Sequence, residues 1–99
     1  MIDPKSLIRV LPVDDFEPNT DAPELSSEQI KEIYRSMLRI RLLDEKMLRL
    51  QRQGRIAFFG PSSGQEASIV GSGYVARSKD WIFPALREAG ILFMRGFPM

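Results

Sequence analysis

The side chains that can carry chemistry in this sequence are carboxylates, lysines, arginines, serines and tyrosines. The 99 residues contain no histidine and no cysteine. A Ser-His-Asp triad, a histidine-ligated metal, a thiolate zinc site and a cysteine nucleophile therefore cannot be built from this chain alone. Any chemistry depends on the remaining polar groups, on the backbone or on a partner chain.

Two local patterns could hold an anion. Arg87 follows an apolar stretch and presents a rigid fork of N–H donors that suits diphosphate or carboxylate oxygens. From the residues alone, a surface charge pair with Glu88 is the favoured interpretation. The glycine-rich run of residues 60–64 precedes an expected helix and could cradle a phosphate with backbone donors. It lacks the Gly-Lys-Ser/Thr ending of a phosphate loop, so a simple capped turn is the favoured interpretation.

Charge and hydropathy exclude two classes of partner. Fourteen basic and thirteen acidic residues give a formal charge of +1, which does not favour nucleic acid. The longest apolar runs are a few residues, far below the roughly 20 that span a bilayer, so no membrane association is expected. The N-terminal residues are acidic and proline-containing rather than basic and apolar, which predicts a cytoplasmic location.

Residues 1–25 are predicted to form an extended N-terminal arm. Four of the seven prolines lie here, and each removes an N–H donor and disfavours helix in the residue before it. The arm has an apolar patch, which we expect to lie along a partner surface: Leu7, Ile8, Val10, Leu11 and Val13.

A long helix is predicted to begin at Ser26, since Gln29 stands at the spacing of a capping box. Apolar residues follow at helical intervals without glycine or proline until Gly54, a typical helix terminator. A second apolar set occupies a neighbouring face of this helix: Tyr34, Leu38, Leu42 and Leu48. Two apolar faces predict that the helix is buried on two sides.

Two shorter helices are expected in the second half. Ser63 and Glu66 repeat the capping-box spacing and predict a helix through Val75 whose small residues permit close approach of another backbone. A third helix is predicted from about residue 85 to 94, ending at Gly96. The apolar segments 56–59 and 81–83 are expected to be extended, with 81–83 buried, and they are too few to complete a sheet.

Several segments in order resemble one family: residues 48–56 (LRLQRQGRI), residues 64–67 (GQEA), residues 80–84 (DWIFP), Arg87-Glu88 and Arg95-Gly96. Over about residues 7–99 the chain resembles the alpha subunit of thiamine-diphosphate-dependent 2-oxo acid dehydrogenases. The resemblance implies an α/β, doubly wound thiamine-diphosphate-binding fold. Residues 26–99 would be its incomplete, mainly helical N-terminal part.

The resemblance also implies the chemistry and the partners. Family alpha subunits pair with a beta subunit, usually as a heterotetramer, and bind thiamine diphosphate and Mg²⁺ across the interface. They decarboxylate pyruvate or a branched-chain 2-oxo acid and pass the acyl group to the lipoyl arm of a dihydrolipoyl acyltransferase. An acetoin dehydrogenase alpha subunit shares this pattern.

Three site residues follow from the resemblance. Arg87 matches the arginine of a tyrosine–arginine pair that holds the cofactor phosphates, and Leu86 replaces the tyrosine, which removes a hydroxyl donor. Phe58 matches an aromatic residue beside the substrate pocket, with core packing as the alternative. Glu66 matches a family signature but is interpreted as part of a helix start, and no residue is predicted to be catalytic.

The family's Gly-Asp-Gly motif, which holds magnesium, does not occur in these residues, so the magnesium ligands are expected outside this chain. The sequence therefore resembles the N-terminal third of an alpha subunit, completed by other segments. The alternative is a truncated, non-catalytic interaction module that binds the beta subunit.

Overall fold

A reciprocal capping motif begins the first helix, α1 (Ser27–Arg52), in the computed structural model, which describes residues 23–98. The backbone N–H of Gln29 donates to the Ser26 hydroxyl at 3.2 Å, and the backbone N–H of Ser26 donates to the Gln29 side-chain oxygen at 2.9 Å. These bonds satisfy N–H groups that a helix start otherwise leaves unpaired. The predicted start of this helix is confirmed.

The end of α1 is also a local motif. Gly54 takes a positive φ of 70°, and its N–H donates to the carbonyl of Gln51. The N–H of Arg55 donates to the carbonyl of Leu50, which completes a Schellman motif. The predicted termination at Gly54 is confirmed, and the physical reason is that glycine reaches this conformation without a Cβ clash.

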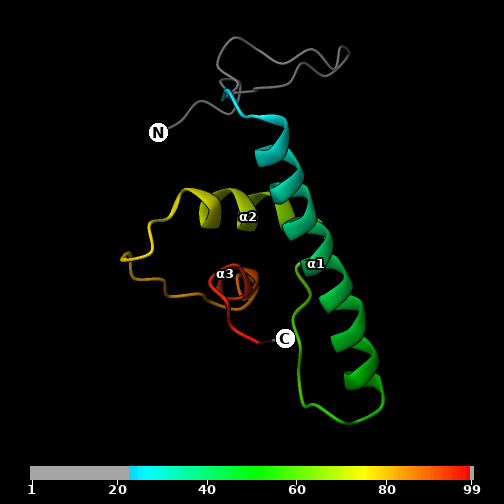
Figure 1. Cartoon of the computed structure of the whole chain (residues 1–99). Helices are drawn as coiled ribbons and strands as arrows, with labels where there is room; N and C mark the ends of the chain where they lie inside the picture. Colours follow the sequence, from blue (N-terminus) through cyan, green and yellow to red (C-terminus); the bar gives the residue numbers. More distant parts are fainter. Residues whose placement is uncertain (1–22, 99) are drawn as a thin grey trace, which may run out of the picture.

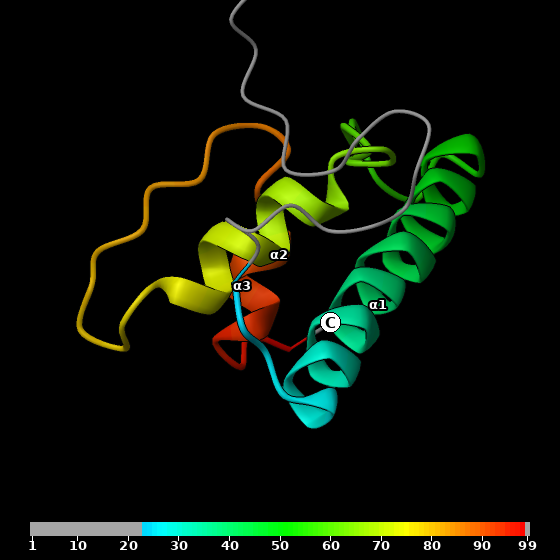
Figure 2. The same cartoon turned by 90° about the horizontal axis from the view of Figure 1, so that it is seen from above.

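One face of α1 packs against the other helices. Ile40 is buried there with Ile69, Val70 and Ile91, and half-buried Ile33 and Met37 pack against this core. Figures 1 and 2 show α2 and α3 on the same side of α1. The prediction that α1 is buried on two sides was wrong within residues 23–98. In the second apolar set, Leu48 is half-buried, but the other three members are exposed: Tyr34, Leu38 and Leu42.

Helix α2 (Glu66–Val75) begins without the predicted capping box. Its N-cap residue is Gln65, which makes no side-chain cap bond. The Ser63 hydroxyl donates instead to Asp44 of α1 at 3.2 Å, and tertiary contacts engage the Glu66 carboxylate. The predicted close approach of another backbone to the small residues of α2 is not found at Gly73, where the Met94 side chain comes close and its sulfur lies 2.9 Å from an added Cβ. At Gly71 the space is open.

The segment between α2 and the last helix runs outward as an irregular loop. No strand occurs in residues 23–98, as expected for apolar segments with too few partners. The side chain of Arg95 fixes the loop by donating to the carbonyls of Arg77 and Asp80, at 2.6 and 2.8 Å. Predicted burial was wrong here for Trp81 and Phe83, which stack on each other in solvent.

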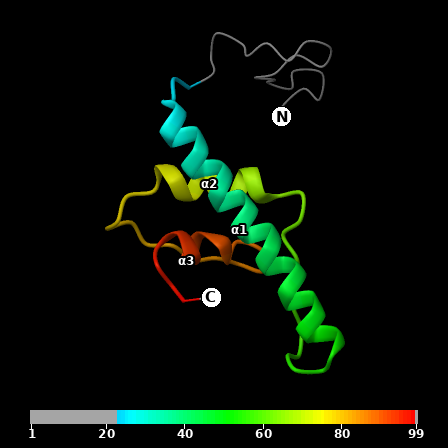
Figure 3. The same ribbon diagram turned by 45° about the vertical axis from the view of Figure 1, so that its right-hand side comes forward.

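The last helix, α3 (Gly90–Met94), is shorter than predicted. The Glu88 carboxylate accepts the backbone N–H of Ala85 at 2.9 Å and holds residues 85–88 in a turn before the helix begins. Gly96, with φ of 90°, follows its end as predicted. Figure 3 shows α2 and α3 side by side with α1 across both, and the two shorter helices are in contact.

Within residues 23–98, no helix combines the length and the apolar character that a bilayer crossing requires.

Candidate functional site

Two of the three predicted site residues meet at one cavity. Leu86 and Arg87 line a space of about 290 Å³ between α1, residues 59–62 and residues 86–90. Phe59 lines the same cavity, whereas Phe58 is 70 % exposed and does not. The chain thus brings an apolar wall and one guanidinium together, and it turns Phe58 toward solvent.

Arg87 is tied to the loop opposite it. Its Nη1 donates to the backbone carbonyl of Pro61, and no other acceptor for this guanidinium occurs within residues 23–98. An arginine carries five N–H donors, and the bond to Pro61 uses only one of them. Because Arg87 is exposed, the other donors can meet an anionic ligand.

Leu86 packs closely on a glycine. A Cβ added at Gly60 would lie 3.2 Å from the Cγ of Leu86, tighter than an ordinary contact. Gly60 is buried, while Leu86 remains 57 % exposed. The absence of a side chain at residue 60 therefore allows residue 86 to approach the loop that holds its neighbour Arg87.

A buried carboxylate on α1 anchors this loop. Asp44 is 1 % exposed, and its Oδ2 accepts the backbone N–H of Ser62 at 2.8 Å. The hydroxyls of Ser62 and Ser63 donate to the same oxygen at 3.1 and 3.2 Å. Sequence reasoning missed Asp44, although a charged residue four positions after Ile40 on the packing face of a helix was the available signal.

A second carboxylate joins α1 to α2. Glu66 is buried, and its Oε1 accepts from the Nε of Arg41 on α1. Its Oε2 accepts the backbone N–H of Gly64 at 2.8 Å. The hydrogen bond from Arg41 lowers the pKa of Glu66 to about 2, and the same pair raises the pKa of Arg41. Glu66 thus serves as an ion-pair partner between helices rather than as the capping residue that was predicted.

This ion pair predicts an acid-sensitive contribution to stability. Because folding lowers the pKa of Glu66, the contribution is complete above the ordinary value of 4.5 and is lost as the pH falls toward 2. Arg41 is half-exposed, so solvent screening reduces the contribution of the pair. We expect Glu66→Gln to lower the free energy of urea unfolding at pH 7 and to flatten its pH dependence between 5 and 2.

The control for this prediction is Glu28→Gln, which removes the exposed pair with Lys31. Exposed pairs contribute little, and Glu28 interacts only with the start of α1, so the control should change the acid profile much less than Glu66→Gln does. An unchanged acid profile in Glu66→Gln would contradict the assigned role of the buried carboxylate.

Metal ligands are not grouped in the part of the chain that the structure describes. Residues 23–98 hold no cluster of three or more acidic side chains able to bind an ion. The side chains around the cavity include the Arg87 guanidinium, which suits a diphosphate, and one carboxylate, Asp44, whose oxygens accept hydrogen bonds from Ser62 and Ser63.

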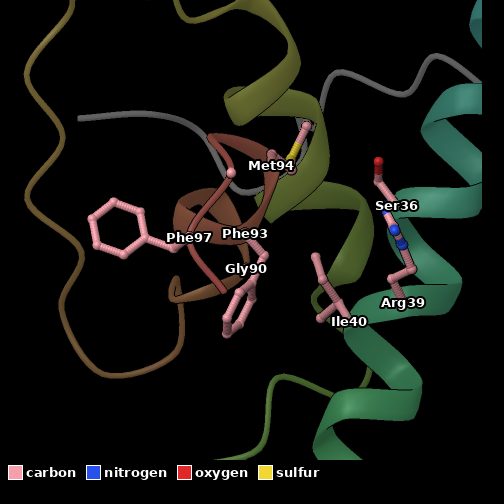
Figure 4. A pocket seen from close by; sticks show the side chains of 8 residues that line it. Ser36, Arg39, Ile40, Gly90, Phe93, Met94 and Phe97 are labelled. Carbon is pink, nitrogen blue, oxygen red and sulfur yellow. The ribbon is translucent and has the colours of Figure 1, made fainter. Parts of the chain in front are cut away.

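A second cavity of about 220 Å³ lies between α1 and α3 (Figure 4). Ile40 points from α1 toward Gly90 and Phe93, and Arg39 lies at the α1 side. No predicted site residue lines this space. It borders the core contact between the two helices, so its walls serve packing.

Comparison with known proteins identifies what the chain is similar to. The family model described as "Dehydrogenase E1 component" matches residues 34–99. The pyruvate dehydrogenase E1 component subunit alpha of Bacillus cereus is 42% identical over 77 residues, which is 78% of this chain and 21% of that protein. The subunit of the same name from Staphylococcus epidermidis is 36% identical over 94 residues, or 94% of this chain and 25% of that protein.

A relative with a different printed substrate is equally similar. The 3-methyl-2-oxobutanoate dehydrogenase subunit alpha of Mycobacterium tuberculosis is 41% identical over 75 residues, which is 76% of this chain and 20% of that protein. The chain therefore spans about a fifth to a quarter of the length of these curated relatives, a smaller share than the expected third.

Proposed function

The chain belongs to the dehydrogenase E1 component family, and on this basis we propose that it is the N-terminal part of a 2-oxo acid dehydrogenase alpha subunit. The reaction proposed is the oxidative decarboxylation of pyruvate or a branched-chain 2-oxo acid with acyl transfer to a lipoyl group. The names of the relatives support both substrate classes, since they include pyruvate and 3-methyl-2-oxobutanoate dehydrogenase subunits.

The observation that carries the proposal within this chain is the setting of Arg87. Its exposed guanidinium lies at a cavity and is tethered to Pro61, so its remaining donors are pre-oriented for a diphosphate. Thiamine diphosphate supplies the carbanion chemistry when it is bound. Arg87 would hold its phosphates, and Leu86 would form an apolar wall beside them.

The remaining site assignments belong to the same proposal. Phe58 would contact the aliphatic part of the 2-oxo acid, and its 70 % exposure supports this by leaving the ring accessible. Magnesium would be held by groups outside residues 23–98. Residues 26–99 would form the N-terminal part of the doubly wound thiamine-diphosphate-binding domain. The 1–25 arm and its apolar patch lie largely outside the described residues.

The proposed partners are a beta subunit and a dihydrolipoyl acyltransferase. Thiamine diphosphate and Mg²⁺ would be titrated calorimetrically into the full chain assembled with a beta subunit and the further alpha-subunit segments that the relatives contain. We expect Arg87→Ala to weaken cofactor binding at least tenfold, because a charged hydrogen-bond donor set is lost. The exposed Arg52→Ala at the end of α1 is the matched control and should change binding less than twofold. Equal effects would contradict the assignment.

Leu86→Tyr offers a gain-of-affinity test. A tyrosine at this position would add a hydroxyl donor beside Arg87, and Leu86 is exposed enough to accept the larger ring. One added hydrogen bond is worth about 1 kcal/mol, so we expect thiamine diphosphate to bind about fivefold more tightly in the same assembly. Leu86→Phe adds the ring without the hydroxyl and should leave the affinity near the parent value. A gain shared by both variants would assign the effect to the ring.

A second candidate function is a non-catalytic module that binds the beta subunit. The exposed apolar side chains of α1 favour it, since Tyr34, Leu38 and Leu42 follow one another along a helix face beside Arg35 and Arg39. Co-purification with a beta subunit, without turnover when the missing segments are added, would support the module. Restored decarboxylation would exclude it.

A further inference from the structure

We infer that Asp44 is a positioning residue that orients Arg87 toward a diphosphate ligand through the peptide group between Pro61 and Ser62. The inference rests on the proposed function for the identity of the ligand, and it adds a residue to that site. Asp44 lines the same cavity as Arg87. Its carboxylate accepts hydrogen bonds from Ser62 and Ser63, so its role is to hold the loop and not to bind the anion.

The first step is the contact between Asp44 and the peptide N–H. The Oδ2 of Asp44 accepts the backbone N–H of Ser62 at 2.8 Å, inside a region where both residues are buried. Hydrogen bonds to a charged acceptor are stronger than neutral ones, and burial keeps water from competing. The orientation of this N–H is therefore fixed by a side chain of α1.

The second step is the carbonyl of the same peptide group. The C=O of Pro61 and the N–H of Ser62 belong to one planar unit, and the described part of the chain has no cis peptide bond. In a trans peptide the N–H and C=O point in opposite directions. The bond from Ser62 to Asp44 therefore aims the Pro61 carbonyl away from α1, where it accepts from the Nη1 of Arg87.

The third step is polarisation. Hydrogen bonds linked in a chain strengthen one another, and here a carboxylate, a peptide group and a guanidinium are in series. The carboxylate increases the partial negative charge on the Pro61 oxygen and tightens its hold on Arg87. The side-chain bonds of Ser62 and Ser63 to Asp44 hold the carboxylate itself in place.

A purely structural role for Asp44 predicts a different outcome. In that case its replacement would lower stability without changing the environment of the guanidinium. Val70→Ala is the matched control, because Val70 is fully buried in α2 and its truncation destabilises the core that it forms with Ile40, Ile69 and Ile91. The comparison is made between Asp44→Asn and Val70→Ala, at a temperature where both are folded.

The experiment uses ¹⁵N NMR of the full chain and inorganic pyrophosphate as the probe. We expect Asp44→Asn to shift the Arg87 guanidinium resonances and to weaken pyrophosphate binding at least fivefold, while Val70→Ala changes neither. Unchanged Arg87 resonances in Asp44→Asn would overturn the inference. If Asp44→Asn does not fold, the same link is tested from the other end with Arg87→Ala. This variant should shift the Ser62 amide resonance, because the peptide group loses its bond to the guanidinium. An unshifted amide resonance would overturn the inference.

This design distinguishes a failure of the diphosphate assignment from a failure of the orienting role of Asp44. If pyrophosphate does not bind the parent chain but Asp44→Asn still shifts the Arg87 signals, the diphosphate assignment is overturned and the orienting link stands. If pyrophosphate binds at Arg87 and Asp44→Asn leaves both the signals and the affinity unchanged, the site stands and Asp44 has no part in it.

Discussion

Replacement of Asp44 by alanine is expected to lower the free energy of unfolding by about 2–4 kcal/mol, the largest effect among the substitutions considered. The change removes the acceptor of the buried Ser62 N–H and of two hydroxyls. A buried N–H without a partner loses its hydration and regains no bond, and the serine hydroxyls can turn only partly toward other acceptors. The expected loss would be measured by urea unfolding followed by circular dichroism.

Glu45→Ala is the matched control for this prediction. Glu45 is the next residue of α1, has the same charge and is exposed. Its removal should change the free energy of unfolding by less than about 0.5 kcal/mol. Comparable losses in both variants would mean that the loop does not depend on the Asp44 carboxylate.

Gly90→Ala is expected to cost about 1–3 kcal/mol through overpacking. A Cβ at this position would lie 2.5 Å from the Cδ1 and 2.9 Å from the Cγ1 of Ile40, and 3.1 Å from the Cγ2 of Ile69. Figure 4 shows Ile40 of α1 pointing toward Gly90 of α3. Because several core atoms are too near, a rotation of one methyl group cannot relieve the clash.

The matched control is Gly71→Ala in α2, where nothing lies within 4 Å of the added Cβ. Alanine is the better helix former, so this variant should gain about 0.5–1 kcal/mol. Thermal unfolding of both variants tests the prediction. Stabilisation of both would show that α3 does not lie against α1 as described.

Local signals in the sequence predicted the features that depend on neighbouring residues. The capping box at Ser26 and the glycine end at Gly54 are made within a few residues, and both are confirmed. The helical spacing of the apolar residues of α1 predicted the packing face correctly at Ile33, Met37 and Ile40, whereas Ile30 of the same series is exposed. The resemblance to a 2-oxo acid dehydrogenase alpha subunit is confirmed by the family match.

Features set by distant partners were not predictable from local patterns. Ser63 has the spacing of a capping residue, but its hydroxyl bonds to Asp44, which is 19 residues away. The third helix was predicted too long because the Glu88 side chain stabilises a turn instead. The apolar character of Trp81 and Phe83 indicated burial, yet residues 23–98 provide no surface that covers them.

The candidate site was only partly accessible to sequence reasoning. Arg87, Leu86 and Phe58 came from the resemblance, and their functional roles stay predictions, as do the extended arm and the cytoplasmic location. Asp44 was missed because its role depends on a loop that folds back onto α1. Such a contact leaves no periodic signal beyond one charge on an apolar face.

The measurement that tests the central claim most directly is 2-oxo acid decarboxylation by the chain assembled with a beta subunit and the further alpha-subunit segments. Pyruvate and 3-methyl-2-oxobutanoate would be compared in the presence of thiamine diphosphate and Mg²⁺, with Arg87→Ala and Arg52→Ala chains in parallel. We predict turnover of at least one substrate by the assembled chain, retained in Arg52→Ala and reduced at least tenfold in Arg87→Ala. Assembly without turnover of either substrate, or turnover indifferent to Arg87, would contradict the account.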